Sequence, residues 1–232
     1  MEILTNIPVN LTPERIFEWL CMRQKNETIA SSVQELLETV RPIVNPKAVY
    51  EVSYVDNKNG DSLDISGIEF TSRVLRVNLD QVGRVFPYVV TCGREIDEIK
   101  ATSTDIMQAF LLDAIKEVVL HSAYRHLKEY LTETYALGQT STMAPGSLED
   151  WPITQQRELF SIFGDVEGLV GVKLTNSFLM IPIKSISGIL FPTEIRFESC
   201  QLCTRGNCIG RRAPYNPDLV TKYKEKVLES AT

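Results

Sequence analysis

The chain has 232 residues, of which 44% are hydrophobic and 23% are charged, with a formal net charge of -6 and a pI near 5.1. This is the composition of a globular protein with one large core, or with one core and a small satellite. The acidic balance gives no general attraction to nucleic acid or to anionic membranes, which bind basic surfaces. No stretch of about eighteen apolar residues and no N-terminal signal pattern is present, so a cytoplasmic protein is expected.

Residues 1–46 are expected to form an N-terminal helical arm. Thr12 precedes Pro13, the pattern of a cap followed by proline in the first helical turn, and apolar residues at helical spacing predict two amphipathic helices over 12–44. Pro42 and Pro46 then end the arm. Cys21 lies in the first of these helices and is expected to pack into the core of the protein.

Two extended regions follow. The alternating segment 48–55 and the turn residues at 57–61 predict a hairpin or meander. Residues 84–92 read as a buried strand, in which Pro87 indicates a sheet edge or a bulge.

The segment 105–130 is expected to be the central core helix, with Ser103 or Thr104 as its cap. Its apolar residues form a broad helical stripe. The members of this stripe are Ile106, Met107, Phe110, Leu111, Ala114, Ile115, Val118, Val119, Ala123 and Leu127.

The second half of the chain combines a long loop, a short helix and strands. Residues 138–151 are rich in Gly, Ser, Thr and Pro, and a loop of this length is often functional. A short helix over 153–163 and strands over 172–175 and 178–191 follow, with Pro182 and Gly188 interrupting the second strand. The sequence thus predicts an α+β fold with a mixed or antiparallel sheet, a long core helix and the N-terminal arm.

Three of the five cysteines, Cys200, Cys203 and Cys208, have the spacing Cys-x2-Cys-x4-Cys. An odd number of cysteines clustered in this way is poor material for a secreted disulfide framework and is typical of a metal or redox site. A two-residue gap lets two thiolates converge on one metal, and Gly206 lets the backbone return the third sulfur toward it. The pattern predicts a zinc or iron-sulfur site, with free or pairable thiols as the alternative.

A fourth ligand would come from elsewhere in the chain. Cys92, at the end of a predicted strand, is the available thiol, although its own position favours core packing. His121 and His126 are alternatives, but they are five residues apart and so do not share a helix face. Satisfied core or surface histidines are the simpler interpretation of this pair.

Arginines bracket the cysteines at Arg205, Arg211 and Arg212. They could lower thiol pKa values, hold a phosphate or a corrin carboxylate, or form a solvated basic patch, and the sequence leaves these readings open. No GxGxxG or GxxxxGK[ST] pattern occurs, so nucleotide binding by those two routes has no support.

Two segments together resemble a known family. Residues 143–160 (MAPGSLEDWPITQQRELF) are similar to the proline-glycine loop and short helix of the S-adenosylmethionine-binding activation, or reactivation, domain of cobalamin-dependent methionine synthase. Residues 174–194 (LTNSFLMIPIKSISGILFPTE) resemble its strand pair in the order of serine, apolar run, proline, serine-glycine and aromatic residue. Stand-alone relatives continue into a cysteine loop closed by residues like 211–215 (RRAPY). We therefore expect an activation-like domain over 47–215, including a cysteine loop at 199–215, and a C-terminal helix over 216–232.

The resemblance implies an accessory protein for reductive reactivation of a corrinoid methyltransferase, belonging to a methionine synthase-type system. The cobalamin would sit on the partner's corrinoid-binding module, S-adenosylmethionine would give the methyl group, and an iron-sulfur centre or zinc would be held by the cysteines. Nucleic acid and membrane partners are not implied. The residues that the resemblance assigns to cofactor binding are Ala144, Pro145, Gly146, Ser147, Asp150, Trp151, Arg211, Arg212 and Tyr215.

Two other functions fit the same residues. One is a non-enzymatic module that carries a metal or binds a corrinoid protein, and the other is a thiol redox sensor that uses the cysteine triplet.

This chain departs from the family pattern at two positions of the loop. The family loop has an arginine and a tyrosine where this chain has Thr142 and Ser147.

Overall fold

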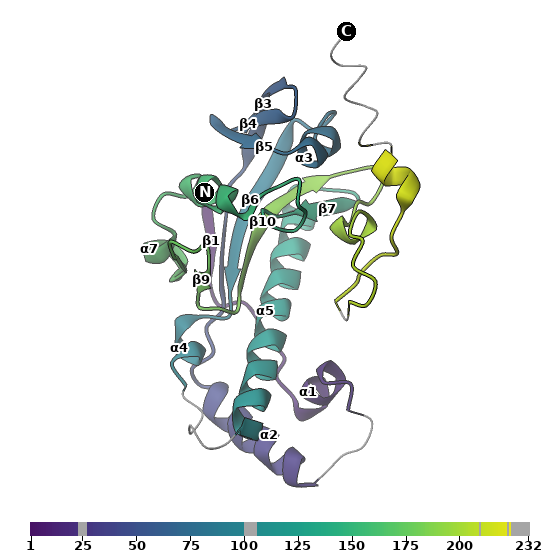
Figure 1. Cartoon of the computed structure of the whole chain (residues 1–232). Helices are drawn as coiled ribbons and strands as arrows, with labels where there is room; N and C mark the ends of the chain where they lie inside the picture. Colours follow the sequence, from purple (N-terminus) through teal and green to yellow (C-terminus); the bar gives the residue numbers. More distant parts are fainter. Residues whose placement is uncertain (23–26, 100–105, 209, 222, 224–232) are drawn as a thin grey trace.

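The computed structural model describes residues 1–22, 27–99, 106–208, 210–221 and 223. Its centre is an antiparallel sheet with the long helix α5 lying along one face (Figure 1). The strands of this sheet are β1 (Glu2–Leu4), β2 (Lys47–Tyr50), β3 (Ser53–Asn59), β4 (Ser62–Ile65), β5 (Ile68–Thr71), β6 (Arg84–Thr91), β7 (Thr140–Met143) and β10 (Ser185–Pro192).

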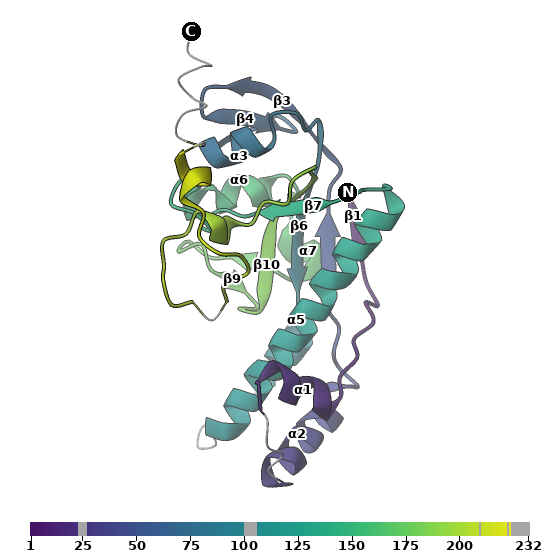
Figure 2. The ribbon, with the colours of Figure 1, turned by 90° about the vertical axis from the view of Figure 1, so that its right-hand side faces the viewer.

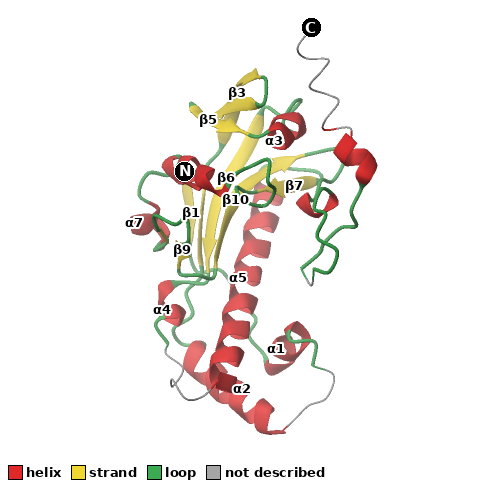
Figure 3. Ribbon diagram, in the orientation of Figure 1, coloured by secondary structure: helices red, strands yellow, loops and turns green. Residues whose placement is uncertain are grey.

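The helices and a small hairpin surround this sheet, and Figure 3 shows how the two kinds of element are distributed. The two-stranded hairpin consists of β8 (Lys173–Leu174) and β9 (Met180–Ile181). The helices are α1 (Pro13–Trp19), α2 (Glu27–Val40), α3 (Arg73–Asn78), α4 (Arg94–Asp97), α5 (Ile106–Thr134), α6 (Gln156–Ser161) and α7 (Val166–Val170), with single 3-10 turns η1 (Ile153–Gln155) and η2 (Ser199–Gln201). The predicted α+β fold with a long helix is confirmed, and the strand pairs of the main sheet are antiparallel.

Strand β6 is the centre of the sheet. It pairs with β10 on one side and with β2 and then β3 on the other, and its residues from Val85 onward are buried. The prediction that Pro87 marks an edge or a bulge is wrong. Pro87 lies opposite the break between β2 and β3, where its carbonyl accepts from the Glu51 N–H at 3.1 Å and the proline's missing donor interrupts no described ladder bond.

The two faces of the sheet are covered by different helices. Tyr50 and Val90 pack with α5 in the larger core cluster, whereas the adjacent Val49 and Val89 pack with the residues around α6 and α7. This alternation is the period-2 pattern of a sheet buried on both sides.

Helix α5 begins with exposed apolar residues. Its middle and C-terminal half bury the predicted stripe from Leu111 to Leu127. Ile106, Met107 and Phe110 were expected in that stripe, and this is wrong, because they are 84%, 48% and 53% exposed where α5 extends beyond the sheet (Figure 2). The predicted caps at 103 and 104 lie outside the described residues.

The N-terminal helices pack against this extended part of α5. The Thr12 hydroxyl caps α1 by accepting from the Arg15 N–H at 3.3 Å, as its position before Pro13 predicts. Cys21 does not pack in the core; it is exposed, with a positive φ of 53°, just after α1 ends. Residues 2–4 form β1 of the main sheet and so lie outside the helical arm.

Several elements were not predicted, among them β1, α3, α4, α7 and the strand β7 that opens the 138–151 loop. Gly188 does not interrupt β10, which runs unbroken past it. The predicted C-terminal helix is described only at 217–221 and 223; its other residues lie outside the described chain. In the described part of the chain, no helix combines the length and the apolar character needed to span a membrane.

Candidate functional site

The cysteine loop, residues 199–215, follows β10 after the connecting segment 193–198 and lies on the same side of α5 as α1 (Figures 1 and 2). It is organised from within by Arg211. The Arg211 guanidinium donates to the carbonyl oxygens of Cys200 (3.0 Å), Ala213 (3.2 Å) and Cys203 (3.2 Å), and also to that of Arg205. One planar cation thus satisfies carbonyl groups from both ends of the loop.

The three clustered cysteines differ in their surroundings. Cys200 and Cys203 are half-buried and Cys208 is exposed. The Cys200 Sγ accepts from the Arg212 N–H at 3.5 Å. This hydrogen bond, with a second from the Ala213 N–H and the Arg212 charge, lowers the pKa of the Cys200 thiol against the opposing effect of burial.

Cys92 lies in a different environment. It is buried in the core cluster at the end of β6, and burial raises the pKa of its thiol to about 12. Among the described residues, no group of three His, Cys, Asp or Glu side chains is arranged to hold a metal ion. The geometry therefore does not gather Cys92 with Cys200, Cys203 and Cys208, and the metal site stays a prediction.

A groove of about 610 Å³ lies between α5, the end of α1 and the cysteine loop. We call it the α5 groove. It is lined by Trp19, Leu20, Phe110, Asp113, Ala114, Glu117, His121, Gly210, Arg211 and Arg212. The α5 members follow a spacing of three, four and seven residues, so they share one face of the helix.

The α5 wall of the groove is acidic. Lys184, from the turn before β10, donates to Asp113 Oδ2 at 3.0 Å and to Glu117 Oε1 at 2.7 Å. Burial lowers the pKa of Lys184, but these two bonds and charges outweigh it and leave that pKa raised. Because one ammonium faces two carboxylates, this wall keeps a net negative charge.

An aromatic pair lies beside the acidic wall. The Trp19 and His121 ring centroids are 4.7 Å apart with an interplanar angle of 41°, and the His121 Nε2 is 3.7 Å from Glu117 Oε2. Burial, followed by the charges of Arg212 and Arg125, lowers the pKa of His121 even though Glu117 raises it. The lowered pKa favours the uncharged form of the His121 imidazole, which lies tilted against a half-exposed indole.

The turn that follows β7 satisfies its own backbone groups. The Gly146 N–H donates to Trp151 O at 2.7 Å, and the Ser147 N–H and hydroxyl donate to Ala144 O at 3.1 and 2.6 Å. Gly146 has a φ of +80°, and a Cβ there would lie 2.8 Å from Ile153 Cδ1. Glycine is thus required by the turn itself.

Asp150 and Trp151 serve the fold around α3. Asp150 Oδ2 accepts from the Val74 N–H at 2.9 Å and from the Ser72 hydroxyl, at the N-terminus of α3. Trp151 is fully buried, packs edge-on against Phe70 and donates from Nε1 to a glutamine side chain. These two predicted binding residues are packing and capping residues in the structure.

The structure brings the turn and the cysteine loop together. The Ser199 hydroxyl lies 3.4 Å from the Ser147 hydroxyl, directly beside Cys200 in sequence. Arg211 and Arg212 reach the α5 groove, whereas the residues 144–151 do not line it. Tyr215 is exposed on the loop surface, outside the groove lining.

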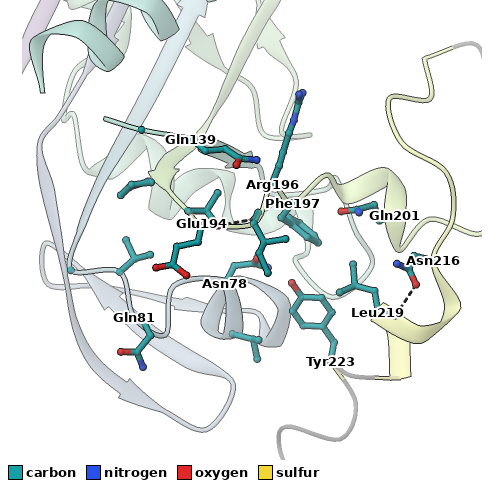
Figure 4. Close-up of a pocket in the computed structure, with 17 residues that line it drawn as sticks. Asn78, Gln81, Gln139, Glu194, Arg196, Phe197, Gln201, Asn216, Leu219 and Tyr223 are labelled. Carbon is teal, nitrogen blue, oxygen red and sulfur yellow. Dashed lines mark hydrogen bonds between the residues drawn. The ribbon is translucent and has the colours of Figure 1, made fainter. Parts of the chain in front are cut away.

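A larger hollow of about 780 Å³ lies between the end of α3, the segment after β10 and the C-terminal segment (Figure 4). Several of its polar side chains are committed: Asn78 donates to Val74 O, Arg196 pairs with Glu198, and Asn216 accepts from the Leu219 N–H. The hollow contains none of the predicted site residues.

The sequence reading did not assign the groove residues on α5 and α1 to ligand binding: His121 was considered only as a metal ligand or a satisfied histidine, and Phe110 and Ala114 only as core residues. Asp113, Glu117 and His121 repeat every four residues along α5, so they lie on one face of the helix, and this polar stripe could have been found from the sequence. The part played by Trp19 and Lys184 depends on tertiary packing and leaves no local signal.

Comparisons with known proteins identify the fold. No family model matches the chain, and no curated protein matches it. Among solved structures, the MetH reactivation domain bound to AdoHcy (S-adenosylhomocysteine) matches with a TM-score of 0.52 and 17% identity, covering 86% of this chain and 81% of that one. The protein therefore has the α+β fold of a methionine synthase reactivation domain, and the resemblance predicted from residues 143–160 and 174–194 is confirmed at the level of the fold.

Proposed function

We propose that this protein is an accessory factor for reductive reactivation of a corrinoid methyltransferase and that it holds S-adenosylmethionine in the α5 groove. The observation that carries the proposal is a ligand-sized groove with a net acidic wall and an aromatic pair, in a fold shared with a domain bound to AdoHcy. A volume of about 610 Å³ falls within the range of small-molecule sites.

The groove suits the chemistry of that methyl donor. S-adenosylmethionine carries a sulfonium and an ammonium group, and Asp113 and Glu117 supply negative charge that Lys184 only partly neutralises. Its adenine ring is flat and aromatic, and the Trp19 indole supported by His121 is a surface for stacking.

The reaction we propose couples two events on the partner. One electron from a reductant and the sulfonium methyl group convert the partner's cob(II)alamin to methylcobalamin, and S-adenosylhomocysteine leaves as the other product. The cobalt supplies the bond-making chemistry. This chain binds and orients the methyl donor, and the exposed Phe110 in the groove lining provides an apolar surface that would help to exclude water when a partner closes over the groove.

The test is a reconstitution followed by absorption spectroscopy. A cobalamin-dependent methionine synthase without its own reactivation domain is prepared in the cob(II)alamin form, and the methylcobalamin spectrum is recorded after adding this protein, a one-electron reductant and S-adenosylmethionine. We expect conversion only when all three are present. Conversion that does not need this protein, or none with all three, would contradict the proposal.

A second candidate is a docking module that binds a corrinoid protein without a methyl donor. The turn at 144–147 favours it, because its N–H donors at Gly146 and Ser147 are already used within the turn. Calorimetry that detects corrinoid-protein binding but no binding of S-adenosylhomocysteine would favour this candidate over the first.

Metal binding by Cys200, Cys203 and Cys208 forms no step of the proposal. The Cys200 sulfur accepts a backbone N–H, and Arg211 already satisfies the carbonyl groups that shape the loop. Metal analysis and an absorption spectrum of anaerobically purified protein test the site directly, since a colourless protein free of iron and zinc would exclude it.

A further inference from the structure

Two arginines line the α5 groove, and their guanidinium groups differ in how far they are hydrogen-bonded within the protein. The Arg211 guanidinium is engaged by carbonyl oxygens of its own loop. The Arg212 side chain is 61% exposed, and its Nε lies 3.6 Å from Glu198 Oε2. The other oxygen of Glu198 accepts both hydrogen bonds of Arg196, at 2.7 and 3.0 Å.

The position of Arg212 is fixed although its guanidinium is lightly paired. Its backbone N–H donates to the Cys200 sulfur, and its neighbour Arg211 ties the loop together from inside. The cost of ordering this stretch of backbone is therefore met in the folded protein before any ligand arrives, which favours tight binding.

The surroundings of Arg212 define where a ligand anion would lie. Its charge acts on His121 in the groove and on Tyr88, next to Tyr124 and Thr142. The opposite charge stands on the α5 wall at Asp113 and Glu117. The groove therefore presents a cation at the loop and anions at the helix, an arrangement that complements an amino acid.

We propose that Arg212 recognises the carboxylate of the methyl donor's amino-acid part, and that the cysteine loop serves to present this arginine. The inference rests on the proposed function, because it assigns one residue to one group of that ligand. A guanidinium fork matches a carboxylate in a two-pronged geometry that a lysine ammonium does not reproduce.

The experiment compares two ligands by isothermal titration calorimetry. S-adenosylhomocysteine has the carboxylate, whereas 5′-methylthioadenosine keeps the adenosine and the thioether but lacks the amino acid. For Arg212→Ala we expect the dissociation constant of S-adenosylhomocysteine to rise about 10- to 100-fold, the range of a lost charge-assisted contact, with that of methylthioadenosine unchanged within about twofold. Arg212→Lys should fall between wild type and Arg212→Ala.

Arg205→Ala is the matched control, because it removes the same charge from an exposed position of the same loop outside the groove lining. It should leave both affinities unchanged. Equal weakening of the two ligands by Arg212→Ala, or no weakening of either, would overturn the role of Arg212 while leaving the proposed function standing. Absence of S-adenosylhomocysteine binding by the wild-type protein would overturn both, and circular dichroism of each variant confirms that it is folded.

Discussion

The turn at 144–151 and the cysteine loop at 199–215 lie side by side, and the composition of each suggests a functional site. They differ in whether their polar and charged side chains are bound within the protein or exposed. In the turn, the carboxylate of Asp150 caps α3 and the indole of Trp151 is buried. In the cysteine loop, Arg211 satisfies the backbone from inside while Arg212 faces a groove with little pairing. A loop is a better candidate for binding when its backbone is ordered and a charged group on it stays largely exposed, as Arg212 does at 61%.

The largest expected effect tests whether the turn is structural. Trp151→Ala should lower the free energy of unfolding by about 3–5 kcal/mol, because a fully buried indole is replaced by a cavity against Phe70. Urea denaturation followed by circular dichroism measures it. Trp19→Ala is the matched control, and its half-exposed indole should cost less than about 1 kcal/mol. Equal costs for the two variants would show that the turn at 144–151 does not depend on its buried indole.

A smaller, local effect is expected from the arginine inside the cysteine loop. Arg211→Ala removes the donor shared by the carbonyl groups of Cys200, Cys203 and Ala213, so the loop should open more easily by about 1.5–3 kcal/mol with little change in global stability. Hydrogen exchange of peptides within 199–215 measures this opening, and peptides from β6 serve as the internal reference. Arg205→Ala should leave the exchange unchanged. Unaltered protection in Arg211→Ala would mean that something other than this guanidinium orders the loop.

The sequence allowed much of the fold to be predicted because its signals are local. Helical spacing gave the long helix over 105–130, and the turn residues at 57–61 gave the hairpin of β3 and β4. Pro87 was misread, since a proline inside a central strand is tolerated when the neighbouring strands part beside it, and that break is set by tertiary structure. Phe110 was misread for a related reason: its apolar side chain lies where α5 has left the sheet.

The candidate site was predicted only in part. Arg211 and Arg212 were singled out because they lie beside clustered cysteines. Which of the two guanidinium groups bonds to the loop backbone and which lies exposed in the groove depends on the tertiary structure. The groove is formed by residues of α1, of α5 up to His121, and of the cysteine loop from Gly210 onward. No local sequence pattern predicts that segments so far apart in the chain come together. Asp150 and Trp151 were assigned to cofactor binding by the resemblance of residues 143–160 to a family loop, and a likeness in motif order does not reveal that Asp150 caps α3 and that Trp151 is buried.

The last comparison sets the thiol of the cysteine loop against the thiol of the core. The backbone N–H of Arg212 lowers the pKa of Cys200, whereas burial raises the pKa of Cys92 to about 12. Alkylation with iodoacetamide across a pH series, resolved by mass spectrometry, should therefore show Cys200 reacting with a midpoint below that of the same cysteine in the urea-unfolded protein.

Cys92 should stay unlabelled in the folded protein at neutral pH. Because its folded pKa is raised, its contribution to stability is present below the unfolded pKa and is lost as the pH rises toward about 12, so labelling should appear together with alkaline unfolding. Arg212→Ala keeps the backbone N–H but removes the side chain's charge and hydrogen bond, so it should move the Cys200 midpoint upward by less than full unfolding does. Labelling of Cys92 as fast as Cys200 would contradict the distinction between a fully buried thiol and a half-buried thiol with a lowered pKa.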